Sequence, residues 1–150
     1  MTVLDIRPAT IDDLPAIVAM LADDPLGAAR ESPEDLTPYR TAFEQLATDP
    51  NQRLVVLSRD GAVVGTLQLT FVPGLSRRGA LRSIIEAVRV HAAARGTGLG
   101  AQLIEWAIEE SRRHGCGLVQ LTTDATRTDA HRFYERLGFT PSHVGFKLAL

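Results

Sequence analysis

A glycine-rich segment, Arg95 to Gly100, stands between an extended apolar stretch and a long amphipathic helix pattern. Its three glycines let the backbone approach a ligand closely, and the helix that follows offers free N–H groups and the positive end of its dipole. Basic residues and then Gly115 close that helix, as expected of a C-terminus. This strand–loop–helix unit predicts an anion site, most often one for phosphate. Taken alone, the segment leaves a plain glycine-rich turn equally open.

The spacing of the glycines separates this loop from two common phosphate loops. The pattern G-x-G-x-G lacks the third-glycine offset of a dinucleotide fingerprint, and no G-K-[ST] follows, which excludes a P-loop. The loop also follows the third strand of a predicted meander, whereas a nucleotide-binding fold places it after the first strand of a βαβ unit. This position argues against a nucleotide-binding fold.

Hydrophobic periodicity along the rest of the chain predicts a mixed α/β domain. Asp60-Gly61 is a strong hairpin signal, and Asp24–Glu34 and Gly74–Ala80 are interpreted as loops. The order of elements predicts a twisted, mostly antiparallel sheet with a parallel β-α-β crossover and flanking helices. Helices are expected over 11–21, 38–48, 99–114 and 129–137, and strands over 3–7, 53–59, 62–72, 81–91, 118–122 and, irregularly, 139–150.

Composition limits the class of protein. The chain has 150 residues, of which 45% are hydrophobic and 23% charged, and this fits one globular domain over residues 1–150. A net charge of −2 argues against a general nucleic-acid binder, and no apolar run approaches the length of a membrane span. The single cysteine, Cys116, cannot form an internal disulfide, and the start of the chain lacks a signal-peptide pattern, so we expect a cytoplasmic protein.

Two motifs carry a resemblance to a known family. The run Arg95-Gly96-Thr97-Gly98-Leu99-Gly100 resembles the R/Q-x-x-G-x-G/A signature of the Gcn5-related N-acetyltransferase (GNAT) family. The run Ala130-x-x-Phe133-Tyr134-x-x-x-Gly138-Phe139 is similar to that family's second signature, although Arg127 stands where many members carry Asn. The C-terminal run Asp129–Leu150 is also similar to the aminoalkylphosphonate N-acetyltransferases within the family.

The resemblance implies an N-acetyltransferase domain over the whole chain. It would transfer an acetyl group from acetyl-CoA to the primary amine of a small molecule by direct attack on the thioester, without a metal. The alternatives are a protein or peptide N-acetyltransferase and a non-catalytic acyl-CoA sensor. A homodimer is a possible assembly, because relatives commonly form one. The residues expected to bind the coenzyme are Val88, Val90, Arg95, Gly96, Thr97, Gly98, Leu99 and Gly100.

Two side chains are candidates for proton transfer. A lysine-like amine has a pKa of about 10.4, so a carboxylate or a water chain must help it to lose a proton. Glu86 is expected on the same strand face as Val88 and Val90, beside the thioester contact; the alternative is a polar residue held by an arginine. Tyr134 is protonated at neutral pH and is expected to protonate the departing thiolate; the alternative is a half-buried aromatic that caps a backbone group.

The remaining chemistry-bearing residues are given structural roles. Cys116 is interpreted as a small buried hydrophobe, and His131 as a surface residue. The other histidines are too scattered to predict a metal site. Arg77, Arg78 and Arg82 form a basic cluster that is either a solvated loop or a site for an anionic group of the acceptor or of a partner subunit.

Overall fold

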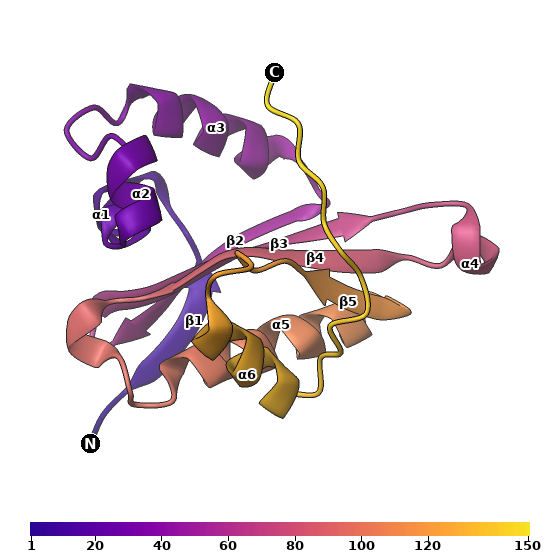
Figure 1. Ribbon diagram of the computed structural model, residues 1–150. Coiled ribbons are helices and arrows are strands. Elements are labelled where there is room, and N and C mark those ends of the chain that lie inside the picture. The colour runs from indigo at the N-terminus through magenta and orange to yellow at the C-terminus, as the bar shows by residue number, and fades with distance from the viewer. The chain divides into compact units, whose positions relative to one another are not determined.

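The computed structural model describes residues 1–150 and divides into two compact units, residues 1–120 and 121–150. A five-stranded sheet lies at the centre of the first unit (Figure 1). The strands follow one another across the sheet in chain order, and the first four pair antiparallel. The N–H of Gly117 donates to the carbonyl of Leu81 at 2.7 Å, so the last two strands begin side by side and run parallel. The strands are β1 (Leu4–Pro8), β2 (Gln52–Arg59), β3 (Ala62–Val72), β4 (Arg82–Val90) and β5 (Leu118–Leu121).

Helices cover both faces of this sheet. Figure 1 shows α1 (Leu14–Ala22), α2 (Pro25–Arg30) and α3 (Thr37–Thr48) on one face and α5 (Leu99–Arg113) on the other. Three shorter elements join them: two 3₁₀ turns and the four-residue α4 (Ser76–Gly79). The expected α/β architecture, with its antiparallel meander and parallel crossover, is therefore confirmed. The buried core is made chiefly by apolar residues of α1, the three central strands and α5, including Val18, Val56, Leu57, Leu67, Leu69, Leu103 and Ile104.

Local signals explain where most of these elements begin and end. Asp60 and Gly61 both have positive φ, 51° and 84°, which is the geometry of the tight hairpin turn that their sequence predicts. Helix α5 ends at Arg113, two residues before Gly115, whose φ of 77° provides the left-handed exit that glycine favours. The boundaries of β3 agree with the sequence prediction, and those of α3 and β4 agree within one residue.

The prediction of a loop over Asp24–Glu34 is wrong, because α2 lies inside it. The Asp24 carboxylate accepts a hydrogen bond from the N–H of Gly27 at 2.6 Å, and Pro25 occupies the first helical position. Gly27 also packs against the carbonyl of Leu21, where a Cβ would stand 1.9 Å from the oxygen. A helix of six residues is too short for apolar periodicity to reveal it.

The second unit contains α6 (Thr128–Arg136) and the C-terminal tail. Helix α6 ends before Gly138, whose φ is 97°, as predicted. The tail does not form the expected strand over 139–150, and Val144, Phe146 and Leu148 are exposed. No helix in either unit is both long enough and apolar enough to cross a membrane.

Candidate functional site

A bulge in β4 sets the geometry of the candidate site. In the β3–β4 register Gln68 faces Glu86, but Thr66 faces Arg89, so two β4 residues lie opposite Leu67. Ala87, the first of these, has a φ of 54°. One extra residue on one strand is a β-bulge, which bends the strand and re-aims the side chains beyond it.

The bulge overturns the prediction that Glu86, Val88 and Val90 share one face. Thr66 and Gln68 lie on one face of β3, and cross-strand partners share a face, so Glu86 and Arg89 lie together on the α1–α3 side. Val88 and Val90 therefore face the α5 side. Strict alternation holds only up to Glu86, because the extra residue reverses the order of faces after it.

The side chain of Glu86 is exposed, and its carboxylate has no hydrogen-bond or ion-pair partner. Beside it, Gln68 Nε2 and Thr70 Oγ1 both donate to Gln52 Oε1, at 3.0 Å and 2.9 Å. The alternative in which an arginine holds Glu86 is therefore not observed. Its carboxylate is available to a ligand or to water on the α1–α3 side of the sheet.

Beyond Glu86, one edge of β4 is open. β5 has four residues and starts beside the first residues of β4, so it is too short to pair with Val88 or Val90. Guanidinium groups already reach this edge: Arg89 donates to the Val88 carbonyl at 2.9 Å, and Arg95 to the Val90 carbonyl at 3.2 Å. An extended amide-bearing ligand could pair with such an edge as an added strand.

The glycine loop prepares the N-terminus of α5. Gly96 and Gly98 have φ of 77° and 82°, and no atom lies within 4 Å of where a Cβ would be at either residue. Thr97 Oγ1 donates to the Ala94 carbonyl at 2.5 Å and braces the loop. The N–H of Gln102 bonds back to Gly98, so the N–H groups of the preceding helical residues lack acceptors within α5. This open, N–H-rich cradle suits a pyrophosphate.

Two ion pairs connect the acidic α1–α2 junction with the end of β4 and the glycine loop. Arg95 lies 3.3 Å from the Asp23 carboxylate, and both side chains are about half exposed. Arg89 lies 3.4 Å from Asp24 and is mostly buried. Arg95 lies at the start of the loop, and part of its charge is balanced by Asp23.

Tyr134 belongs to the second unit, where it lies half-buried on α6. Its ring makes edge-on contacts with Phe133 and Phe139, at centroid distances of 5.1 Å and 5.8 Å. The aromatic residues of the second motif therefore form one small cluster around Tyr134.

The other residues singled out in the sequence lie elsewhere. Burial raises the pKa of the Cys116 thiol, against a weaker opposing effect of its bond with Ser83, which disfavours a nucleophilic thiolate. Arg77 and Arg78 occupy a left-handed turn in α4, at the tip of the β3–β4 hairpin (Figure 1). The structure contains no group of three or more His, Cys, Asp or Glu side chains that could hold a metal ion.

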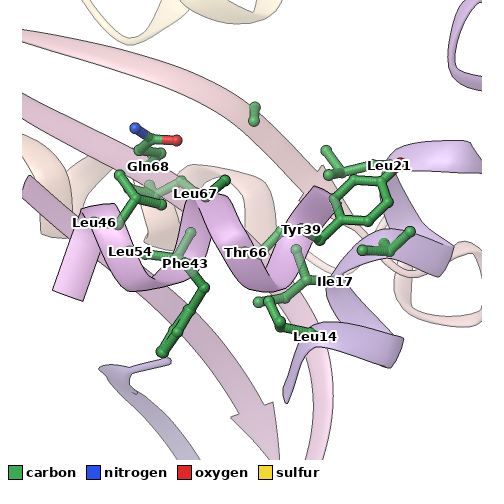
Figure 2. Close-up of a pocket in the computed structure, with 13 residues that line it drawn as sticks. Leu14, Ile17, Leu21, Tyr39, Phe43, Leu46, Leu54, Thr66, Leu67 and Gln68 are labelled. Carbon is green, nitrogen blue, oxygen red and sulfur yellow. The ribbon is translucent and has the colours of Figure 1, made fainter. Parts of the chain in front are cut away.

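An apolar pocket between α1, α3 and the sheet was not predicted (Figure 2). It has a volume of about 150 Å³ and reaches the bulge at Ala87. In the sequence its helical walls are visible only as the apolar stripes of two amphipathic segments, and nothing in those stripes indicates a gap beneath them. The lining is Leu14, Ile17, Val18, Leu21, Tyr39, Ala42, Phe43, Leu46, Leu54, Thr66, Leu67, Gln68 and Ala87.

Comparison with known proteins identifies the family of the chain. The family model for the acetyltransferase (GNAT) family matches residues 14–139. The chain belongs to the GNAT family. It is accordingly an acetyl-CoA-dependent acyltransferase, and the match includes both the glycine loop and the Tyr134 motif.

Several proteins similar to this GNAT chain match it over its full length or nearly so. It is 35% identical to an aminoalkylphosphonate N-acetyltransferase of Salmonella typhimurium, over the whole chain and 94% of that protein. A crystal structure described as a transcriptional regulator from Bacillus halodurans C-125 is 48% identical, with a TM-score of 0.94 over 99% of this chain and all of that one. A Trypanosoma brucei acetyltransferase is 28% identical, with a TM-score of 0.77 over 99% of this chain and all of that one.

Proposed function

We propose that this enzyme acetylates the primary amine of a small molecule by direct attack of the amine on the thioester of acetyl-CoA. The observation that carries the proposal is the exposed, unpartnered carboxylate of Glu86, one residue before the bulge in β4 and beside the open β4 edge. Acetyl-CoA supplies an activated acyl group, and the protein must bind the coenzyme, deprotonate the amine and protonate the leaving thiolate.

The glycine loop and the open β4 edge bind the coenzyme in this proposal. Backbone N–H groups from Gly96 to Gly100 and the α5 dipole neutralise the pyrophosphate, and Arg95 adds positive charge. The pantetheine amides pair with the backbone at Val88 and Val90. A backbone N–H of the same edge stabilises the oxyanion that forms on the acyl carbon.

Glu86 and Tyr134 move the protons. Glu86 takes a proton from the acceptor ammonium, directly or through water, because its carboxylate is exposed and has no competing cation. Tyr134 gives its phenolic proton to the thiolate, as the matching motif of the family implies. A backbone-capping role for the Tyr134 hydroxyl is the competing assignment.

The acceptor is first sought among small amines, including those with an anionic group. The Salmonella typhimurium relative makes aminoalkylphosphonates the first compounds to test. Arg82 faces Val72, four residues along β3 from Gln68, which is about 13 Å at the rise of a strand. The arginine cluster near α4 would therefore meet a different part of an acceptor from the part held beside Glu86.

The test is a panel of small amines, aminoalkylphosphonates and peptides assayed with acetyl-CoA, following thiol release. Small amines should be acetylated with the highest kcat/KM. A clear preference for peptide N-termini would replace the small-molecule proposal, and coenzyme binding without turnover of any acceptor would favour a sensor. A cytoplasmic site of action, where acetyl-CoA is supplied, is part of the same proposal.

A further inference from the structure

Helix α3 only partly buries its apolar stripe. Tyr39, Phe43 and Leu46 lie on one side of this twelve-residue helix, yet no residue of α3 is buried. Helix α5, on the opposite face of the sheet, buries Leu99, Leu103, Ile104, Ala107 and Ser111. An amphipathic helix normally gains its stability by burying its apolar face, so the space beneath α3 is suited to an apolar group from outside the chain.

Most polar groups on the pocket wall are already bonded within the protein. The Tyr39 hydroxyl donates to Glu31 at 2.9 Å and accepts from the N–H of Ser32 at 2.8 Å. The Thr66 hydroxyl donates to the Val55 carbonyl at 2.8 Å.

At the sheet side, the amide nitrogen of Gln68 is bonded to Gln52. A ligand in the pocket therefore meets carbon atoms over most of the wall (Figure 2). A polar arm of a ligand would lose its hydrogen bonds to water on entering the pocket, and the wall would not replace them.

We infer that the acceptor is an amine with an alkyl arm, which fills the pocket between α1, α3 and the sheet. This inference rests on the proposed function, because it places the amino group beside Glu86. Ala87, the neighbour of Glu86, lines the pocket, so one ligand can present its ammonium to the carboxylate and its carbon chain to the apolar wall. The charge of the free carboxylate thus selects the ammonium end of the ligand, and the apolar lining selects its carbon chain.

The inference predicts a dependence on chain length. Each methylene group transferred from water to an apolar site contributes about 0.8 kcal/mol, which corresponds to about a fourfold change in affinity. Affinity should therefore rise by about this factor per methylene along a homologous series, until the pocket is full, and then level off or fall.

Calorimetry with ethylamine, butylamine, hexylamine and octylamine tests the inference, with thiol release measured in parallel. Substituting Ala42→Leu, which adds carbon atoms to the α3 wall, should abolish the gain for the longer amines. Ala47→Leu makes the same change at an exposed position of α3 outside the lining and should preserve it.

The two readouts separate the inference from the proposed function. Affinity that does not change with chain length, or that changes equally in both variants, would overturn the inference. If Ala42→Leu raises the melting temperature and leaves the chain-length dependence intact, the space is a packing defect and the inference is also wrong. Chain-length-dependent binding without thiol release from any amine would instead leave the pocket assignment standing and remove the proposed function.

Discussion

Tyr134 is the residue whose proposed role depends on a single oxygen atom. Replacing it by Phe keeps the ring that contacts Phe133 and Phe139 and removes only the proton donor. We expect Tyr134→Phe to lower kcat by roughly 10²–10⁴-fold and to leave the affinity for acetyl-CoA nearly unchanged, measured by steady-state kinetics and calorimetry. Normal turnover would show that another group protonates the thiolate.

Glu86 is tested in the same way by an isosteric change. Glu86→Gln should lower kcat/KM by roughly 10²-fold or more at neutral pH, because the amine loses its base. The loss should shrink as the pH approaches the pKa of the acceptor amine, since more amine is then neutral without help. Glu105→Gln, an exposed glutamate on α5, serves as the control. An equal loss at every pH would indicate that Glu86 positions the acceptor instead.

Asp13 contributes to stability through charge. Arg7 donates to both of its carboxylate oxygens, at 2.7 Å and 2.9 Å, and the Thr10 N–H donates at 2.7 Å. These bonds lower the pKa of Asp13 from 3.8 to about 2, against the opposing effect of burial. A carboxylate whose pKa is lower in the folded state stabilises the fold at pH values above its unfolded-state pKa. This contribution is lost as the pH falls from about 4 towards 2.

Asp13→Asn should therefore lower the free energy of unfolding by about 2 kcal/mol at pH 7. Urea denaturation at pH 7 and near pH 2 measures the effect, and the difference from wild type should narrow at the lower pH. Asp12→Asn, at an exposed neighbour, is the control and should change little. A difference that is the same at both pH values would contradict the electrostatic origin.

At the scale of elements, the glycine loop makes the sharpest prediction. Gly98 has a left-handed φ of 82°, which Asp and Asn tolerate about equally well. Gly98→Asp should weaken acetyl-CoA binding by at least tenfold, because a negative charge faces the pyrophosphate, whereas Gly98→Asn should retain much more affinity. Calorimetry compares the two variants. Equal losses would show that space, and not charge, matters at this position.

The elements also show what a sequence pattern can predict. Long segments such as β3 and α5 repeat their apolar pattern along their whole length, and the structure places them where the sequence predicts. The bulge at Ala87 has no such signal, because alanine is an ordinary strand residue and its positive φ depends on the pairing with β3. A single inserted residue was enough to reverse the predicted face of Val88 relative to Glu86.

At the scale of the whole molecule, the coenzyme side is more predictable than the acceptor side. The glycine loop and the Tyr134 motif are local sequence patterns, and the family match contains both. The pocket beneath α3 depends on how far two helices stand from the sheet, which no local pattern encodes. Helix α2 is too short to show a periodic apolar pattern, and the tail lacks such a pattern. The sequence therefore predicts neither segment correctly.

The proposed reaction is direct acetyl transfer from acetyl-CoA to an amine. Thiol release, N-acetylated product and the mass of the intact protein, measured in one reaction with an accepted amine, test it most directly. We predict one molecule of N-acetylated amine for each thiol released, with no acetyl group on the protein at any time. Thiol release without acetylated amine, or an acetylated protein that passes its acetyl group to the amine in a second step, would contradict direct transfer.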